Sequence, residues 1–265
     1  MKWPRRLIII RHGESVFNAI KNTKEANPDY QRFRMLYEED AKNGFSFRPE
    51  TISLASLLQQ RYEPTISDPN CPLTDLGRSQ ARVTGIQLAI AMPEAIKVPS
   101  VIYVSPYRRA LETAEGVING WLALSEARVE KDERISERDI GIQFMYNDWR
   151  IFNVFHPMHA KHNALQDRYY AKPLNGESMR EVRLRNRQIL QRMIRKHAGE
   201  VVLLVAHGIS ILCIRSLLEH WTPEEFIDQE ANHLPPNCGV TIYECDPLRN
   251  KAGNLKLVTC NKVYY

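Results

Sequence analysis

The sequence predicts an α/β protein in three layers, with a mostly parallel central sheet flanked by helices and two helical, lid-like insertions. Two observations carry this prediction. Short apolar runs typical of buried strands occur at residues 7–10, 101–104 and 201–206, and each is followed by a helix signal. Strands that alternate with helices in this way usually form parallel sheets covered on both faces.

The first half of the chain contains two of these strand-to-helix units. The run at 7–10 leads directly into Arg11 and His12, and the run at 101–104 leads into Ser105 and Pro106. Serine is a favoured helix N-cap and proline a favoured first helical residue. We therefore expect a helix to begin at Pro106.

The second half repeats the alternation. Ser178 and Glu181 have the spacing of a capping box, and apolar residues recur on one helical face until Gly199 ends the pattern. The strand at 201–206 follows. Thr222 marks a further helix start, and two more strands are expected at 240–244 and 255–259.

Two long segments, 19–71 and 142–174, do not follow the alternation. Both are rich in aromatic and basic side chains, and each is expected to contain some helix. Connections of this length in a compact domain are usually lids or binding loops. We therefore predict a single domain over residues 1–265, with these segments as insertions that form a lid.

The composition indicates an ordinary globular chain that works inside the cell. The 265 residues are 43% hydrophobic and 25% charged, and the net charge of +5 favours anionic partners without separating nucleic acid from small phosphate esters. No apolar run approaches the ~20 residues of a membrane span, and the run at 7–10 is too short for a signal peptide. The five cysteines are scattered without any Cys-x-x-Cys, so neither disulfides nor a zinc site is expected. We expect a cytoplasmic protein.

The residues that carry chemistry stand at the ends of the predicted strands. Arg11 and His12 follow the first strand, and His207 follows the strand at 201–206. Ligands of such sheets bind beyond the carboxyl ends of the strands. A neutral imidazole can attack phosphorus where cations already stabilise the charge on the phosphate oxygens, and Arg11 and Arg109 can supply that charge. Glu137 is the candidate proton donor for the leaving alkoxide.

Six short blocks resemble the histidine phosphatase superfamily, also called phosphoglycerate mutase-like. They lie in the family's order and span most of the chain. The blocks are Arg11-His12-Gly13-Glu14-Ser15 with Asn18, Leu73-Thr74-x-x-Gly77-x-x-Gln80-Ala81, Ser105-Pro106-Tyr107-Arg108-Arg109-Ala110-x-x-Thr113, Glu137-Arg138-x-x-Gly141, Asn175-Gly176-Glu177-Ser178 and Ala206-His207-Gly208.

The resemblance implies a role for each matching residue. His12 would become a phosphohistidine, and Glu137 would act first as general acid and then as the base that activates water. The phosphate pocket would be formed by Arg11, Asn18, Arg109, His207 and Gly208, where Arg109 is chosen over Arg108 because the family's arginine immediately precedes the alanine. The family uses no metal and needs no cofactor for hydrolysis.

Several other residues have simpler interpretations. Ser15 and Ser178 are expected to be helix caps rather than nucleophiles, because both lie at helix starts. His156, His159 and His162 lack an obvious fourth ligand, so no metal site is expected. The arginines that follow Ser178 are expected to form a solvated helix face rather than a grip on nucleic acid.

Three functions remain in competition. Hydrolysis of a phosphomonoester is favoured, because the basic and aromatic blocks of cofactor-dependent mutases are not found in 142–174 and because 19–71 replaces a short loop of those mutases. A cofactor-dependent phosphoglycerate mutase-type isomerase and an inactive module that binds phosphorylated ligands are the alternatives. The expected partner is a small phosphorylated substrate, with no nucleic acid and no membrane, and a homodimer is compatible with the sequence. The resemblance is to a phosphatase-like branch, and aromatic and basic residues of the two insertions would select the leaving group.

Overall fold

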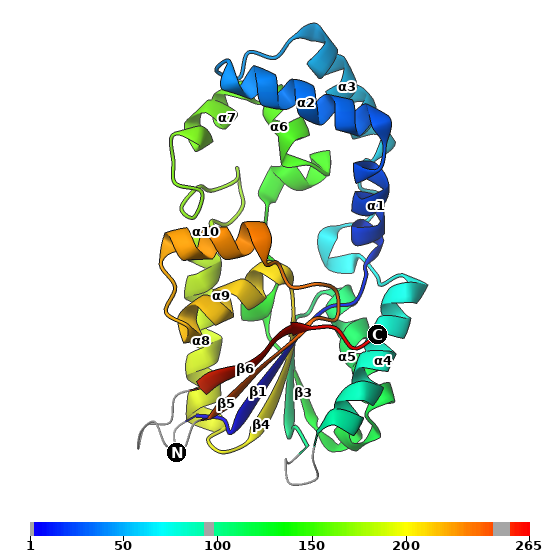
Figure 1. The fold of residues 1–265 in the computed structure, drawn as a ribbon, viewed down its shortest axis with the longest axis vertical. Coiled ribbons are helices and arrows are strands. Elements are labelled where there is room, and N and C mark those ends of the chain that lie inside the picture. The colour runs from blue at the N-terminus through cyan, green and yellow to red at the C-terminus, as the bar shows by residue number, and fades with distance from the viewer. Residues whose placement is uncertain (1–2, 93–97, 246–254) are drawn as a thin grey trace. The chain divides into compact units, whose positions relative to one another are not determined.

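The computed structural model describes residues 3–92, 98–245 and 255–265 (Figure 1). The chain divides into two compact units. The first unit comprises Met1–Val16, Pro69–Glu137 and Glu181–Tyr265, and the second comprises Phe17–Asp68 and Arg138–Arg180. Each unit is described by itself below.

The two stretches of the second unit overlap the predicted insertions at 19–71 and 142–174. The proposed single domain over residues 1–265 stays a prediction. Within the described residues, no helix is both long enough and apolar enough to cross a membrane.

A mostly parallel sheet forms the centre of the first unit. In the described part of the chain its strands are β1 (Arg6–Arg11), β2 (Val101–Val104), β3 (Arg128–Lys131), β4 (Val201–Ala206), β5 (Val240–Cys245) and β6 (Leu255–Lys262). The strand order is β3-β2-β4-β1-β5-β6. Neighbours among the first four are parallel, whereas β5 is antiparallel to both β1 and β6. The predicted strands and the predicted sheet type are confirmed.

Helices cover both faces of this sheet (Figure 1). On one face lie α4 (Asp75–Ala91) and α5 (Arg108–Gly120), and on the other lie α8 (Met179–Lys196) and α9 (Gly208–Leu218). Because successive residues of a strand point to opposite faces, Ile8 packs with the helices of the first face and Leu7 with those of the second. The three-layer α/β prediction is therefore correct.

The helix starts were predicted with mixed success. Thr222 begins α10 (Pro223–Asn232) with a complete capping box, as expected. The predicted start at Pro106 is wrong, because α5 begins at Arg108 with Tyr107 as its N-cap. The Ser105 hydroxyl instead lies 2.7 Å from the Nε2 atom of His207, and this contact belongs to the site described below.

The second unit is helical and has a core of its own. Its core is formed where α2, α3 and α6 pack together around Phe33, Leu58 and Ile151, all of which are fully buried. Both insertions therefore contain helix, as expected. The helices are α1 (Val16–Glu25), α2 (Pro28–Lys42), α3 (Pro49–Arg61), α6 (Trp149–Phe155) and α7 (Pro157–Ala164). Short 3-10 helices in the chain are η1 (Asp68–Asn70), η2 (Leu122–Glu126), η3 (Glu133–Ile135) and η4 (Gly141–Tyr146).

Candidate active site

The register of the central strands brings two histidines together. Arg11 of β1 pairs with Ala206 of β4, so the next residues, His12 and His207, leave the sheet side by side. The amide of His12 donates to the carbonyl of Ala206 at 3.0 Å, and the two imidazole ring centroids lie 5.1 Å apart. Both side chains are buried. The expected meeting of the two rings at one edge of the sheet is therefore present in the structure.

A third strand end joins this pair. Ser105 follows β2, the other neighbour of β4, and its hydroxyl lies 2.7 Å from Nε2 of His207. The Tyr107 ring meets the His207 ring edge-on, with centroids 5.1 Å apart. Sequence reasoning assigned Ser105 only to a helix cap, although its place directly after a central strand was a usable signal.

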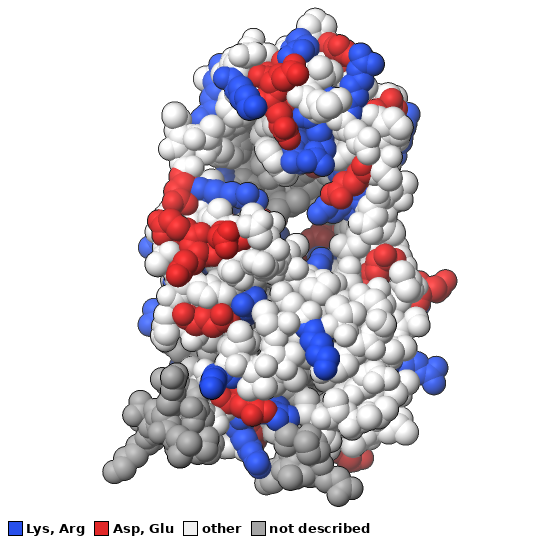
Figure 2. Space-filling model, viewed as in Figure 1, with Lys and Arg blue, Asp and Glu red and all other residues white. Residues whose placement is uncertain are grey.

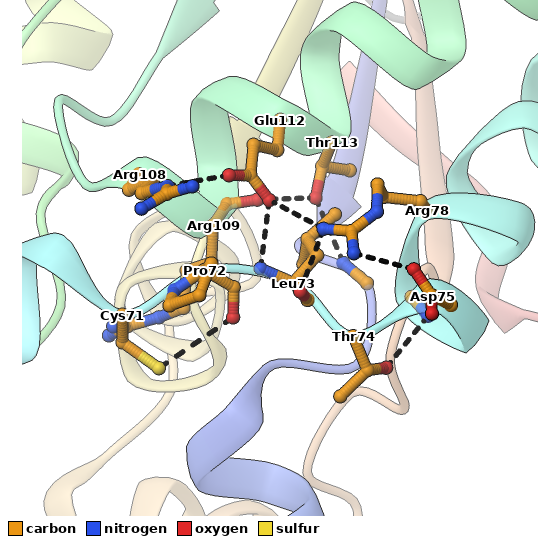
Figure 3. Close-up of polar contacts among 12 residues, drawn as sticks. Cys71, Pro72, Leu73, Thr74, Asp75, Arg78, Arg108, Arg109, Glu112 and Thr113 are labelled. Carbon is orange, nitrogen blue, oxygen red and sulfur yellow. Dashed lines mark hydrogen bonds and ion pairs between the residues drawn. The ribbon is translucent and has the colours of Figure 1, made fainter.

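Two arginines lie at the same site, and their partners distinguish them from Arg108. Arg109 is buried, and its guanidinium carbon lies 5.0 Å from the centroid of the Tyr107 ring. Arg11 donates from Nη1 to the carbonyl of Pro235 at 2.6 Å. Arg108 is exposed and paired with Glu112 at 2.6 Å (Figure 3). Geometry therefore favours Arg109 over Arg108 as the second cation of the site.

Two buried polar atoms at this site lack a partner. Within the residues that the structure describes, neither Nε of Arg11 nor Nδ1 of His207 has a hydrogen-bond partner. Buried polar atoms nearly always have a hydrogen-bond partner. Two such atoms without a partner, at a site that contains two guanidinium groups, are typical of a place where an anion binds.

The environment keeps both imidazoles neutral at pH 7. Burial, followed by the charges of Arg11 and Arg109, lowers the pKa of His12 well below its usual 6.5. Burial, followed by the charge of Arg109, lowers the pKa of His207 in the same direction. Burial also lowers the pKa of Arg11, opposed by the negative charge of Glu137, but a guanidinium keeps its proton. The site therefore holds two neutral rings and two positive charges.

One hydrogen bond assigns the proton on the His12 ring. Its Nδ1 atom lies 2.7 Å from the carbonyl oxygen of Gly13, which can only accept. Nδ1 therefore carries the proton in the neutral ring, and the lone pair is on Nε2. This is the arrangement that a nucleophilic imidazole requires.

The loop after His12 is fixed against the start of α4. A Cβ atom on Gly13 would lie 2.5 Å from the carbonyl oxygen of Gly77, so only glycine allows this approach. Thr74 caps α4 and donates its hydroxyl proton to Glu14, whose amide donates to Gln80. The block of residues 73–81 therefore supports the loop that carries His12.

Glu137 lies in a segment that Arg185 holds in place. Arg185 donates to the carbonyl oxygens of Arg134, Ser136 and Glu137 at 2.8, 2.9 and 2.9 Å. Ser210 of α9 also donates to Ser136. The negative charge of Glu137 acts to raise the pKa of Arg11, so these two groups interact electrostatically. Sequence reasoning had placed Arg185 on a solvated helix face and missed this contact.

Two further expected pocket residues lie on different units. Gly208 is the first residue of α9, directly after His207 as N-cap, so the amides at the start of this helix face the same strand end. Asn18 lies on α1 in the second unit. Its expected contribution to the phosphate pocket stays a prediction.

The remaining candidate features have local hydrogen-bond partners or contain none of the candidate site residues. His156, His159 and His162 are bonded to Tyr146, Asn163 and Gln166, respectively, and the described residues contain no group of three or more side chains arranged to hold a metal ion. A surface cavity of about 430 Å³ contains none of the candidate site residues. It is lined by Arg134, Gln188, Gln191, Arg192, Arg195 and Lys196.

The cationic side chains that line this cavity form ion pairs or lie at a helix C-terminus. Arg192 is paired with Glu130 and Arg134 with Asp132, while Arg195 and Lys196 lie in the last turn of α8, where positive charge stabilises a helix. Figure 2 shows basic and acidic side chains interspersed on the visible face of the protein. Because its cations have these roles and its lining contains none of the candidate site residues, we assign this cavity no part in the chemistry of the histidine pair.

The sequence of this chain is similar to the sequences of known proteins. The family model described as the histidine phosphatase superfamily (branch 1) matches residues 58–256, which include Arg109, Glu137 and His207. A 2,3-bisphosphoglycerate-dependent phosphoglycerate mutase of Azorhizobium caulinodans is 32% identical over 170 residues, covering 62% of this chain and 76% of that protein. The corresponding mutase of Brucella anthropi is 28% identical over 164 residues, covering 60% and 75%.

Solved structures share the fold over nearly the whole chain. Bacillus stearothermophilus YhfR aligns with a TM-score of 0.62 at 23% identity, covering 96% of this chain and 95% of its own. A mycobacterial glucosyl-3-phosphoglycerate phosphatase, solved with VO3, aligns with a TM-score of 0.62 at 19% identity, covering 97% and 98%. With the strand-end histidines and the family match over most of its length, this chain belongs to the histidine phosphatase superfamily.

Proposed function

We propose that the protein is a phosphomonoester hydrolase that works through a phosphohistidine on His12. The observation that supports this most strongly is the state of the His12 ring. It is neutral, its Nδ1 proton is held by Gly13, and its Nε2 lone pair is free of that bond. Half-buried Arg11 and the buried Arg109 and His207 lie beside it and can bind the phosphoryl oxygens.

In the first step, Nε2 of His12 attacks phosphorus and the bond from phosphorus to the ester oxygen breaks. The charge on the three equatorial oxygens is stabilised by Arg11 and Arg109, and His207 contributes a further donor. The leaving alkoxide takes a proton from Glu137. The products of this step are the free alcohol and phosphohistidine.

In the second step, Glu137 is ionised and removes a proton from water, whose oxygen attacks the phosphorus. The bond from phosphorus to Nε2 breaks, which releases inorganic phosphate and returns His12 to its neutral form. Glu137 regains its proton for the next turnover, so no cofactor is consumed.

The test is hydrolysis of p-nitrophenyl phosphate by the wild type and by His12→Ala, together with trapping of an acid-labile phosphoryl group on the protein. We expect turnover and a trapped phosphohistidine for the wild type alone. Indistinguishable rates for the two proteins would reject the proposal. They would favour a module that only binds phosphorylated ligands.

A mutase is the second candidate, because both relatives described above are bisphosphoglycerate-dependent phosphoglycerate mutases. Mutase and hydrolase share the first step and differ in whether a substrate hydroxyl or water accepts the phosphoryl group. Hydrolysis is favoured because residues 17–68 form three helices, whereas the resemblance to cofactor-dependent mutases implies only a short loop at this place. Efficient isomerisation of 3-phosphoglycerate in the presence of 2,3-bisphosphoglycerate would reverse this preference.

The substrate is proposed to be a small phosphorylated molecule. The aromatic and basic side chains of the second unit are the proposed determinants of the leaving group. A hydrolysis screen over phosphorylated metabolites, peptides and nucleotides would identify the class, and equal rates across all of them would argue against selection of the leaving group.

A further inference from the structure

We infer that Thr113 is a positioning residue that aligns the loop carrying the nucleophile with the helix carrying Arg109. This inference rests on the proposed phosphoryl transfer through His12. Thr113 lies on α5, is fully buried, and lies 100 residues from Gly13 in the sequence, although the two are in direct contact.

The Thr113 hydroxyl makes two hydrogen bonds, and the direction of its bond to Arg109 (Figure 3) determines the direction of its bond to Gly13. It lies 2.6 Å from the carbonyl oxygen of Arg109, which can only accept, so the hydroxyl proton is used there. The amide of Gly13 then donates to the hydroxyl oxygen at 3.0 Å. The bond to Arg109 is an ordinary contact within a helix, and it turns the lone pairs of the oxygen toward the loop.

Gly13 is the residue through which this contact reaches the nucleophile. Its carbonyl oxygen accepts the Nδ1 proton of His12 and thereby sets the tautomer and orientation of the ring. Its amide is held by Thr113, so both polar groups of Gly13 are fixed. Any displacement of the loop would therefore turn the His12 ring relative to the phosphate site.

The second bond connects the same hydroxyl to the element that presents Arg109. The Arg109 carbonyl lies at the first turn of α5, and its side chain lies at the phosphate site. The Thr113 hydroxyl thus connects the loop that carries the attacking His12 with the backbone of Arg109, whose side chain binds the phosphoryl oxygens. A displacement of about 1 Å between reacting groups can lower a rate by about 10²-fold, so this contact acts on catalysis as well as on folding.

The test compares Thr113→Val, which keeps the shape and removes the hydroxyl, with Thr113→Ser, which keeps the hydroxyl. Thr241→Val is the matched control, because the buried Thr241 hydroxyl also accepts a backbone amide, that of Asn261 at 3.2 Å, between β5 and β6. Each variant is assayed with p-nitrophenyl phosphate at a temperature where circular dichroism shows it fully folded.

We expect Thr113→Val to lower kcat by about 10–100-fold and to change KM by less than about threefold, because the arginines remain in place to bind phosphate. Thr113→Ser should restore kcat to within about threefold of the wild type, and Thr241→Val should stay within about twofold. Vanadate, which mimics the pentacoordinate transition state, should lose about tenfold in affinity for Thr113→Val, whereas inorganic phosphate should lose much less.

The outcomes distinguish failure of the positioning role from failure of the proposed hydrolysis. A Thr113→Val enzyme with wild-type kcat, a Thr113→Ser enzyme as damaged as Thr113→Val, or an equal loss in Thr241→Val would overturn the positioning role. A wild type that binds vanadate without turnover would reject the proposed hydrolysis alone, since the ratio of vanadate to phosphate affinity would still decide the role of Thr113. A wild type that binds neither anion would overturn both.

Discussion

Acidification should destabilise the ligand-free protein through the two buried histidines of the site. In the unfolded chain a histidine has a pKa near 6.5, but burial and the two arginines hold the pKa values of His12 and His207 well below that value in the folded state. Between these pKa values the unfolded state binds more protons than the folded state. Stability is therefore fully present above about pH 6.5 and is lost as the pH falls.

The size of the effect follows from proton linkage. Each pH unit costs about 1.36 kcal/mol for each proton that only the unfolded state binds. Over the interval from pH 7 to pH 5, one histidine that stays neutral in the fold contributes a loss of about 2 kcal/mol, and the pair contributes about 4 kcal/mol. That is a large part of the ~5–15 kcal/mol that usually stabilises a folded protein.

The assay is urea unfolding at pH 7, 6 and 5 in buffers free of phosphate, for the wild type and for His207→Gln. The variant removes one of the two linked protons, so its loss of free energy of unfolding between pH 7 and pH 5 should be smaller by about 2 kcal/mol. The control His233→Gln removes an exposed histidine and should follow the wild type. Identical pH dependence for His207→Gln and the wild type would refute the conclusion that the fold keeps this ring neutral.

Three further outcomes test the proposed chemistry. Arg109→Ala should lower kcat for p-nitrophenyl phosphate by about 10²–10³-fold, because it removes a preorganised donor, whereas exposed Arg108→Ala should stay near the wild type; similar losses in both would contradict the assignment. Glu137→Gln should lose about 10²–10⁴-fold on an alkyl phosphate and far less on p-nitrophenyl phosphate, whose leaving group needs little protonation; equal losses would remove Glu137 from the acid role. Arg185→Gln should lower the free energy of unfolding by about 1–3 kcal/mol in urea titrations, because it removes a guanidinium that donates hydrogen bonds to three backbone carbonyls. An unchanged urea midpoint would count against the role of Arg185 in holding the Glu137 segment.

The sequence was sufficient for the sheet and for the two histidines because local signals coincide there. The apolar run before Arg11 and the one before His207 are both buried strands, and polar residues directly after them can only lie at a strand end. Parallel pairing then places both ends on one edge of the sheet. Two short motifs therefore predicted a contact between residues 12 and 207, which are distant in the chain.

The supporting contacts could not be predicted in the same way, because they depend on tertiary register rather than on local pattern. Ser105 has the local signature of a helix cap, yet its hydroxyl meets a ring 102 residues away. Arg185 has the pattern of an exposed helical residue, yet its guanidinium binds three carbonyls of the segment that ends at Glu137. In both cases the local sequence is compatible with a solvent-exposed position and with a buried contact, and only the packing of distant elements determines which one forms.

The family match begins at residue 58, so the Arg11-His12 motif lies outside the matched range, and the chain between them leaves and re-enters the first unit. Ser15 forms a β-bridge with Leu73, and the amide of Val16 donates to the carbonyl of Pro72 at 3.0 Å. The inserted helices therefore start and finish at one hydrogen-bonded point. Loop-closure entropy grows only slowly with length, so a long insertion between such fixed ends costs little more than a short one. The loop that carries His12 and helix α4 can thus keep their contact whatever the length of the chain between them, so the Arg11-His12 motif is separated from the matched range in sequence but not in space.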